Sequence, residues 1–370
     1  MTKKRAIVVG AGIVGLATAR KLALKGYAVE VIERSEQAQG ASVRNFGMVW
    51  PIGQPKGEMY ERAMKSRAIW KETAEEAGIW YGEVGSLHMA YLPEELAVIE
   101  EFAAENTQYS ILNPAQVTSE AVVKKDLKAA LWSDEELIVD PREAIAKIPS
   151  YLQERLGVKF HWNTTVVEVN HPKVKTAKGE ELSADAIFVC SGADFETLYP
   201  ALFEAQEITK CKLQMMRLVS QPNEWKIGPA LCGGLTLVHY EAFKQPPSHA
   251  ALKTYYEQNH PESLEWGLNV MVSQNGSGEL TIGDSHEYGE DLSPFNQEFI
   301  DQMILDYLAK FADFKDWSVA SRWHGIYPKM TNGATSLVLT PEEGVTIING
   351  LGGAGMTLSF GLAEDVLEQL

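Results

Sequence analysis

The first forty residues contain two apolar, β-branched runs separated by a helical pattern. Residues 6–9 and 28–32 are the two runs, and Leu16, Ala19 and Leu22 between them recur at the spacing of a helix with one buried face. The pattern predicts a strand, a helix and a second strand, which is the beginning of a βαβ unit.

Similar patterns recur along the rest of the chain. Helices are predicted at 57–77, 93–105, 141–155 and 294–311, and from about Met356 onward. Asp140 and Pro141 are residue types that suit the N-cap and the first position of the third of these helices. Further strands are predicted at 87–91, 158–162, 164–169, 186–190 and 345–349, and a hairpin at 173–181. From 211 to 282 the chain changes to alternating strands at 213–220, 235–240, 267–272 and 279–282, which predicts a β-rich second domain.

The turn after the first strand reads Gly10-Ala11-Gly12-Ile13-Val14-Gly15. Gly10 permits a tight turn, Gly12 lets the backbone approach a pyrophosphate, and Gly15 lets the helix pack closely on the strand. Phosphates would then face the free N–H groups at the start of the helix. Glu33 ends the second strand, where a carboxylate can accept hydrogen bonds from a ribose. Because strand, glycine motif, helix, strand and acid occur in this order, they indicate dinucleotide binding rather than an ordinary glycine-rich loop.

Composition and charge narrow the possible functions. The 370 residues include 33 Lys and Arg against 50 Asp and Glu, and the formal net charge of −17 argues against nucleic acid and anionic membranes as partners. Cys190, Cys211 and Cys232 show neither a C-x-x-C nor a zinc-site spacing, so we expect idle thiols and no metal. The basic start precedes the glycine motif rather than a cleavable apolar segment, and no run has transmembrane length. We therefore expect a cytoplasmic protein, and the sequence does not indicate its oligomeric state.

Several stretches carry a family resemblance. The N-terminal motif, residues 41–51, the strand end at Ser191-Gly192 and the glycine-rich helix start at 350–355 resemble the D-amino acid oxidase (DAO) family of FAD enzymes, which includes glycine oxidase and sarcosine oxidase. More narrowly, residues 41–55, 283–289 and 322–327 resemble a clade proposed to act on aminophosphonates. The resemblance covers essentially the whole chain.

This resemblance implies a fold and a division into domains. We expect an α/β protein in which a Rossmann-like FAD-binding domain of the glutathione-reductase type carries an inserted, β-rich α+β substrate domain. The FAD-binding domain would take residues 1–85, 139–211 and 321–370. The substrate domain would take residues 86–138 and 212–320.

The resemblance also implies FAD as the cofactor, rather than NAD. The ADP half would lie over residues 10–15 and Glu33, and the helix start at 352–357 would present its N–H groups to the flavin. The residues expected to hold the cofactor are Gly10, Ala11, Gly12, Ile13, Val14, Gly15, Glu33, Arg34, Ala41, Ser42, Asn45, Phe46, Gly47, Met48, Val166, Ser191, Gly192, Gly325, Gly350, Gly352, Gly353, Ala354, Gly355, Met356 and Thr357. Arg44 stands where related enzymes attach the flavin to a histidine, and residues 322–330 contain no cysteine, so we expect non-covalent FAD.

Two departures from the amino acid oxidases bear on the substrate. Related enzymes hold a substrate carboxylate with an arginine at the position of Tyr327 and another at about Gly353, and both are absent here. A planar carboxylate suits a guanidinium fork, whereas a tetrahedral phosphonate suits several separated donors. The candidates for binding such an anion or lining the substrate site are Arg44, His239, Tyr240, His286, Arg322, His324, Tyr327 and Lys329. Each could equally have a structural role; Arg322, for example, could pair with a carboxylate in the sheet.

These features together predict an FAD-dependent amine oxidoreductase. It would oxidise the C–N bond of a small amine to an imine, which water hydrolyses to a carbonyl. The expected substrate is an aminophosphonate or an N-methyl or hydroxy derivative. The alternative is a glycine, sarcosine or D-amino acid oxidase with a rearranged carboxylate site, and a nicotinamide-dependent dehydrogenase and a non-catalytic flavin-binding protein are more distant possibilities.

Overall fold

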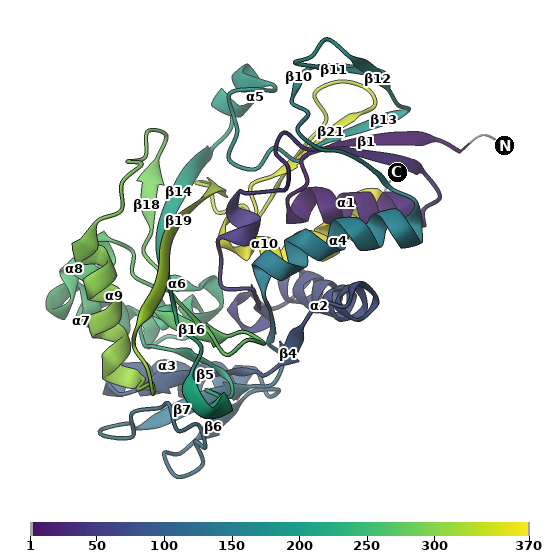
Figure 1. Ribbon diagram of the computed structural model, residues 1–370. Coiled ribbons are helices and arrows are strands. Elements are labelled where there is room, and N and C mark those ends of the chain that lie inside the picture. The colour runs from purple at the N-terminus through teal and green to yellow at the C-terminus, as the bar shows by residue number, and fades with distance from the viewer. Residues whose placement is uncertain (1–2, 369–370) are drawn as a thin grey trace.

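The computed structural model describes residues 3–368, which fold around two large β-sheets (Figure 1). The first sheet has six strands in the order β20-β21-β13-β1-β2-β9. Its strands are β1 (Arg5–Val9), β2 (Ala28–Ile32), β9 (Lys159–His161), β13 (Ala186–Val189), β20 (Leu337–Leu339) and β21 (Val345–Asn349). All neighbouring pairs are parallel except β20 with β21. The strands expected at both ends and in the middle of the chain therefore meet in one sheet, and the predicted Rossmann-like fold is confirmed.

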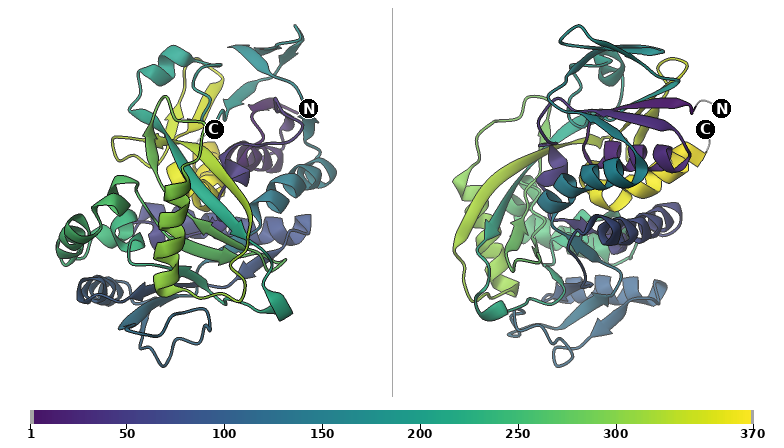
Figure 2. Two further views of the ribbon diagram at one scale, coloured as in Figure 1. Left: turned by 60° about the vertical axis from the view of Figure 1, so that its left-hand side comes forward. Right: turned by 45° about the vertical axis from the view of Figure 1, so that its right-hand side comes forward.

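Four helices lie on one side of this sheet. They are α1 (Ile13–Leu24), α2 (Glu58–Ala77), α4 (Pro141–Leu156) and α10 (Gly355–Glu368). The second of them, α2, packs on α10 and α4. The N-terminal helix α1 and the C-terminal helix α10 lie side by side, although they are at opposite ends of the sequence (Figure 2). The predicted N-cap of α4 is confirmed, since the Asp140 carboxylate accepts the N–H groups of Arg142 and Glu143 at 2.9 and 3.4 Å.

A small antiparallel sheet covers the opposite face. It consists of β10 (Val166–Asn170), β11 (Lys173–Thr176) and β12 (Glu181–Ser183). The predicted hairpin at 173–181 corresponds to β11 and the beginning of β12. Val174 from this sheet packs with Ile7, Ile187 and Ile347 of the six-stranded sheet in one buried cluster. The six-stranded sheet is thus covered on both faces, which explains the continuous apolar runs in β1 and β13.

The second large sheet has nine strands and is mainly antiparallel. Its order is β18-β14-β17-β16-β15-β5-β7-β6, and β19 pairs with β14. The strands are β5 (Ser86–Ala90), β6 (Ser110–Leu112), β7 (Ala129–Ser133), β14 (Ile208–Leu218), β15 (Ala230–Cys232), β16 (Met271–Gln274), β17 (Leu280–Gly283), β18 (Glu287–Gly289) and β19 (Val319–Met330). A third sheet contains β3 (Met48–Val49), β8 (Leu137–Val139) and β4 (Tyr81–Glu83). The expected β-rich second domain is therefore present.

The remaining helices are α3 (Pro93–Glu105), α5 (Pro200–Glu204), α6 (Thr236–His239), α7 (His249–Asn259), α8 (Pro261–Glu265) and α9 (Glu298–Phe311). Short 3-10 turns occur at Ala41–Val43, Pro51–Gly53, Pro222–Glu224, Glu241–Lys244 and Gly352–Ala354. The strand predicted at 235–240 is wrong, because residues 236–239 form α6, where the Thr236 hydroxyl donates to the Gly233 carbonyl at 2.8 Å. A short apolar run does not separate strand from helix by its periodicity alone.

The longest ladder joins β14 to β19, from the pair Ile208 and Met330 to the pair Leu218 and Val319. Both strands rise from the nine-stranded sheet toward the beginning of α10 (Figure 1). The domain boundaries expected after residue 211 and before residue 321 fall inside these two strands. The β14–β19 pair is thus the element that brings the second sheet to the dinucleotide-binding part.

Candidate active site

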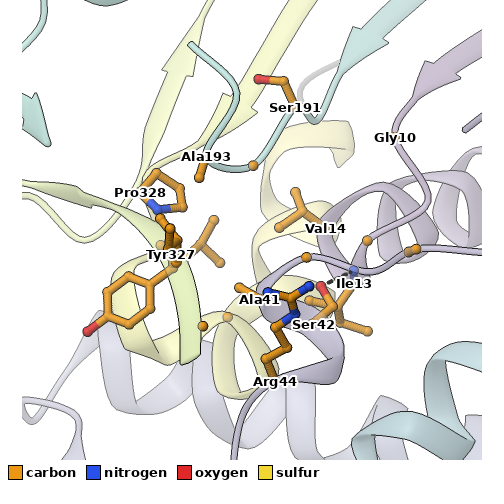
Figure 3. Close-up of a pocket in the computed structure, with 18 of the residues that line it drawn as sticks. Gly10, Ile13, Val14, Ala41, Ser42, Arg44, Ser191, Ala193, Tyr327 and Pro328 are labelled. Carbon is orange, nitrogen blue, oxygen red and sulfur yellow. Dashed lines mark hydrogen bonds between the residues drawn. The ribbon is translucent and has the colours of Figure 1, made fainter. Parts of the chain in front are cut away.

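A cavity of about 840 Å³ lies between the two large sheets. Its walls come from the loops after β1, β2 and β13, from β14 and β19, and from the beginning of α10. Figure 3 shows Ile13 and Ser42 on one side of this space, Tyr327 and Pro328 on the other, and Ser191 and Ala193 above. Ligand sites of proteins commonly have volumes of roughly 300–1,000 Å³.

The glycine motif forms one end of the cavity. Gly10 has a positive φ of +102°, and a β-carbon on Gly15 would lie 1.9 Å from the Gly10 carbonyl oxygen. At Gly12 only the Ser42 hydroxyl lies within 4 Å of a β-carbon, at 3.1 Å, so the space beyond Gly12 is open. The turn, the open approach and the close packing expected of the three glycines are all present, although Gly15 itself and Ala11 lie behind the cavity wall.

The Glu33 carboxylate is fixed at the same end. It accepts the N–H groups of Ala11 at 2.9 Å and Ser35 at 3.0 Å, so it holds the glycine turn to the end of β2. Each carboxylate oxygen has a further lone pair, and Glu33 lines the cavity. Arg34 also lines the cavity, and its guanidinium pairs with Asp194 at 2.7 Å. Val166, another residue expected to hold the cofactor, lines the cavity from β10.

The stretch at 41–48 divides between the cavity and the core. Ala41, Ser42, Asn45 and Phe46 line the cavity, and the Ser42 hydroxyl accepts the Ile13 N–H at 2.9 Å. The structure places Gly47 and Met48 outside it. A β-carbon on Gly47 would lie 1.9 Å from the Val139 carbonyl, and Met48 pairs with Ile138 of β8. These two residues pack the stretch against the third sheet.

The start of α10 faces the same cavity from the other side. Gly350, Gly352, Gly353, Gly355 and Met356 line it, together with Ser191, Gly192 and Gly325. Ala354 and Thr357 do not, since the Thr357 hydroxyl turns toward Trp50 and accepts its N–H at 2.9 Å. Two helix starts, those of α1 and α10, therefore point into one elongated space. The first N–H groups of a helix have no partner within that helix and favour negative charge.

These residues fit FAD. The open space over Gly12 beside the start of α1 suits the pyrophosphate, Glu33 suits the ribose, and the glycine-rich start of α10 suits the flavin. Among the glycines of the cavity wall, Gly353 has no clash for a β-carbon, but Gly10 and Gly350 would meet other atoms at 2.4 and 2.9 Å. The cavity thus combines closely packed turns with space for an elongated, negatively charged cofactor.

Four of the expected substrate-site residues lie together at the far end of the cavity: His239, Tyr240, His286 and Tyr327. Arg44 also lines the cavity. The His239 and His286 rings lie 4.5 Å apart between centroids, and the His286 and Tyr327 rings 6.5 Å apart. Burial lowers the pKa of His286 to about 4 and holds the pKa of His239 well below its usual range. Burial also raises the pKa of Tyr327 and Tyr240, so both phenols stay protonated and can donate hydrogen bonds.

The structure does not bring Arg322, His324 and Lys329 into the cavity wall. Arg322 and His324 lie on the opposite face of β19 from Tyr327, because side chains alternate along a strand. The Arg322 guanidinium pairs with Asp301 of α9 at 3.0 Å, and the His324 ring bonds to Asn296 at 2.9 Å. Lys329 shares the face of Tyr327 but extends past the wall, where its ammonium lies 3.3 Å from the Tyr288 hydroxyl.

Other residues of the site were not selected from the sequence. Asp284 and Asn269 line the cavity beside His286, as do Met215 and Met271, and Lys210 lies nearer the dinucleotide end, where it pairs with Glu196. Asp284 belongs to the stretch 283–289 that carried the family resemblance. Its signal was an acid directly after a buried apolar strand, and that position alone could have marked it.

Comparisons with known proteins agree with this geometry. Residues 5–369 match the family model described as FAD dependent oxidoreductase (DAO). Glycine oxidase of Pseudomonas aeruginosa is 41% identical over 69 residues, which are 19% of this chain and 18% of that protein. D-Amino acid dehydrogenase of Helicobacter pylori is 24% identical over 251 residues, covering 52% of this chain and 60% of the relative. These matches therefore span less than two thirds of the length of either relative.

Solved structures match over nearly the whole chain. L-Proline dehydrogenase from P. horikoshii has a TM-score of 0.77 at 21% identity, covering 99% of this chain and 92% of that one. Glycine oxidase from Geobacillus kaustophilus has a TM-score of 0.76 at 18% identity, covering 99% and 95%. These two establish a shared fold. Across residues 3–368, no helix has the length and apolar character needed to cross a membrane. Because the family model matches almost the full length of this chain, the chain belongs to the DAO family of FAD-dependent oxidoreductases.

Proposed function

We propose that the protein oxidises a small amine that also carries a tetrahedral anionic group, an aminophosphonate or its N-methyl or hydroxy derivative. The observation that carries this proposal is the donor set around Tyr327. The hydroxyl of Tyr327 lies 3.5 Å from the point that a β-carbon on Gly353 would occupy. The two positions at which related enzymes are expected to hold a carboxylate thus adjoin one another, and neither supplies a guanidinium.

The lysine and arginine side chains in and around the cavity differ in whether a carboxylate pairs with them. Arg34, Lys210 and Arg322 are paired with Asp194, Glu196 and Asp301, respectively. Arg44 donates instead to the backbone carbonyl of His324 at 3.2 Å, and Lys329 to the Tyr288 hydroxyl at 3.3 Å. Within residues 3–368, neither Arg44 nor Lys329 has a carboxylate oxygen within 4 Å. Of the two, Arg44 lines the cavity, so its positive charge is available to an anion there, whereas Lys329 extends past the cavity wall.

The arrangement of these groups suits a tetrahedral anion better than a planar one. Arg44 reaches the cavity from the loop after β2, whereas Tyr327 lines it from β19. A phosphonate has three oxygens pointing in different directions and carries up to two negative charges, so donors from separate elements can each bind one oxygen. A planar carboxylate has two oxygens and would accept hydrogen bonds from only part of this set of donors.

The chain's own residues can orient an amine for oxidation and exclude water from it. Bound FAD supplies the redox chemistry by accepting two electrons and a hydrogen from the carbon beside the nitrogen. Phe46, Leu213, Met215 and Met271 provide apolar wall around the substrate end. Oxidation gives an imine, and its hydrolysis releases a carbonyl compound and an amine or ammonia.

The proposal is tested by anaerobic flavin reduction with a panel of amines. 2-Aminoethylphosphonate and its N-methyl derivative should give kcat/KM at least about a hundredfold above glycine, sarcosine and D-alanine, which corresponds to about 3 kcal/mol. β-Alanine is the matched control, because it has the same chain length and a planar carboxylate. If glycine or D-alanine outperforms every phosphonate amine, the substrate class is wrong and the alternative of a rearranged amino acid oxidase is favoured.

The attachment of FAD is part of the same proposal. Cys190 and Cys211 lie in or beside the cavity, and burial raises the pKa of both thiols to about 12. A protonated, buried thiol is a poor nucleophile, which supports non-covalent FAD. Acid precipitation should leave all of the flavin in the supernatant. Yellow colour retained by the washed pellet would show a covalent bond.

A further inference from the structure

Hydrogen-bond acceptors gather at one corner of the substrate end. Asp284 directly follows β17, and Asn269 precedes β16 on the neighbouring strand. Their backbones exchange two hydrogen bonds, each 2.9 Å long, so their side chains are neighbours. Both residues line the cavity, and they are only 5% and 2% exposed. In the described part of the chain, the Oδ1 atoms of Asp284 and Asn269 have no hydrogen-bond partner.

His286 adds a third acceptor to this corner. Its Nδ1 lies 2.7 Å from the Gly267 carbonyl oxygen, which can only accept, so Nδ1 carries the proton. Burial lowers the pKa of His286 to about 4, so the ring is neutral near pH 7 and Nε2 carries a lone pair. Nε2 lies 4.0 Å from Asp284 Oδ2. At this distance the two atoms form no hydrogen bond with each other.

Without a hydrogen-bond donor, this group of buried acceptors destabilises the folded protein. A buried carboxylate or amide oxygen loses its hydration, and leaving it unpaired costs free energy. No Lys or Arg among residues 3–368 lies within 4 Å of Asp284, and His286 is its nearest basic partner. Burial raises the pKa of Asp284 well above its usual range, which Asn269 only partly offsets. The corner lacks a group that brings several N–H bonds and a positive charge.

We propose that Asp284 binds the ammonium group of the substrate and accepts one of its protons, while Asn269 Oδ1 and His286 Nε2 accept its other N–H bonds. In this step one N–H bond breaks, an O–H bond forms on the Asp284 carboxylate, and the electron pair of the N–H bond remains on nitrogen as a lone pair. The substrate becomes a neutral amine and Asp284 a neutral acid. This inference rests on the proposed function only in requiring that the substrate is an amine.

Proton removal is chemically necessary because an ammonium has no lone pair with which to stabilise the imine that oxidation forms. A small alkylamine is almost fully protonated near neutral pH, since amines of this type have a pKa of about 10.4, like lysine. A carboxyl group whose pKa is raised by burial holds a transferred proton better than an exposed one does. The position of Asp284 lets it contact the ammonium group, and its burial favours the transfer of the proton to its carboxylate.

Other titratable groups around Asp284 come from every neighbouring strand and from the α6 segment. They are Cys211 on β14, His239 at the end of α6, Tyr240 directly after α6, His286 directly before β18, Tyr288 on β18, and Tyr327 and Lys329 on β19. Burial raises the pKa of the thiol and the phenols and lowers the pKa of both histidines. These groups are therefore uncharged near pH 7, apart from Lys329, and Asp284 is the carboxyl group among them.

The experiment compares the pH profile of kcat/KM for the wild-type holoenzyme and Asp284→Asn, with the amine that reduces the flavin fastest. The wild type should show a plateau bounded by Asp284 at acid pH and by the substrate ammonium at alkaline pH. Asp284→Asn should fall about a hundredfold or more near pH 7.4, where only about a thousandth of such an amine is neutral. Its kcat/KM should then rise tenfold per pH unit and approach the wild-type value above the pKa of the amine.

Glu287→Gln is the matched control, since its carboxylate pairs with Lys212 outside the cavity wall. It should keep the wild-type profile. Flavin content and the bound flavin spectrum of all variants should be unchanged. If Asp284→Asn does not fold, the wild type decides alone: with amines of different ammonium pKa, the alkaline limb should move with the amine and the acid limb should stay in place.

Three results would overturn the inference. One is an Asp284→Asn profile with the shape and height of the wild type, another is a loss of activity that is equal at all pH values, and the third is an acid limb that moves with the amine. If amines without a phosphonate react fastest, the proposed substrate class fails, but the same profiles with those amines still decide the role of Asp284. If no amine reduces the flavin, both proposals fail together.

Discussion

The Tyr327 hydroxyl lies 3.5 Å from the point that a β-carbon on Gly353 would occupy. Tyr327 belongs to β19 of the nine-stranded sheet, and Gly353 lies in the turn before α10, so the two parts of the molecule meet at this contact. The phenol stays neutral because burial raises its pKa. A neutral hydrogen-bond donor therefore lies beside Gly353 in the cavity.

Replacing this donor should change the substrate preference. In Tyr327→Arg, kcat/KM for glycine and sarcosine should rise by about tenfold to a hundredfold, because a charged hydrogen bond contributes about 1.5–3 kcal/mol. Tyr327→Phe is the control, and it should lower kcat/KM for the phosphonate amine by only about 0.5–1.5 kcal/mol, since other donors remain. Anaerobic flavin reduction measures both. If the ratio of kcat/KM for glycine to kcat/KM for the phosphonate amine is the same in Tyr327→Arg as in the wild type, Tyr327 does not contact the anionic group of the substrate.

Gly12→Val should abolish FAD binding without unfolding the protein. The space beyond Gly12 is open to the cavity and only the Ser42 hydroxyl lies near, at 3.1 Å, so a valine fits by occupying the place of the pyrophosphate. The purified variant should be colourless and should not bind added FAD, while its circular dichroism matches that of the wild-type apoprotein. Gly289→Val, at a glycine with only Leu292 nearby at 3.9 Å, is the control and should stay yellow. A yellow Gly12→Val protein would show that the motif is misread.

The sequence was sufficient for the dinucleotide-binding part because its signals are local. The glycine motif, the strand before it and Glu33 after it lie within one βαβ unit, so their spacing along the chain determines their spacing in the fold. The strand at 186–189 is a continuous apolar run, and the strand at 345–349 is mainly apolar, as is common in a sheet buried on both faces. The helices at 249–259 and 261–265 were not foreseen, because a few polar residues between strands carry little periodic signal.

The substrate end could be predicted only in part, because it depends on contacts between distant segments. Tyr327, Arg322 and His324 were all candidates in the sequence, with Tyr327 and His324 favoured over Arg322. Their faces are decided by α9, which packs on one side of the β14–β19 ladder and supplies Asp301 to Arg322. Asp284 was passed over because its neighbour Asn269 comes from another strand, and the missing hydrogen-bond partners become visible only in three dimensions.

The role of Glu33 can be separated from its structural role. Its carboxylate holds the Ala11 N–H and is free to accept from a ribose hydroxyl, so Glu33→Ala should weaken FAD binding by about 1.5–3 kcal/mol. The bound flavin spectrum should stay the same, because the flavin lies at the other end of the cofactor. Glu30→Gln on β2, the strand that Glu33 follows, should leave the FAD affinity unchanged, since the Glu30 carboxylate pairs with Arg5 and His161. Normal affinity with an altered spectrum in Glu33→Ala would place Glu33 away from the ribose.

Glu136 should make the unfolding free energy depend on pH. This carboxyl group is fully buried beside the nine-stranded sheet, where it accepts the Ser86 hydroxyl at 2.9 Å and the Ile52 N–H at 3.3 Å. Burial raises its pKa from 4.5 to about 7. The folded protein therefore binds a proton that the unfolded chain releases, and the stability that Glu136 contributes is complete below pH 4.5 and is lost as the pH rises through 7.

In the wild-type protein, the titration of Glu136 should lower the free energy of unfolding by about 1–3 kcal/mol between pH 5 and pH 8, the size expected from the linkage of one titrating group. Glu136→Gln cannot titrate, so urea unfolding should show a smaller loss over the same range, and Glu204→Gln, which changes an exposed carboxyl group, should behave as the wild type does. An equal pH dependence in Glu136→Gln and wild type would mean that Glu136 is ionised in the folded protein and that its two hydrogen bonds offset its burial.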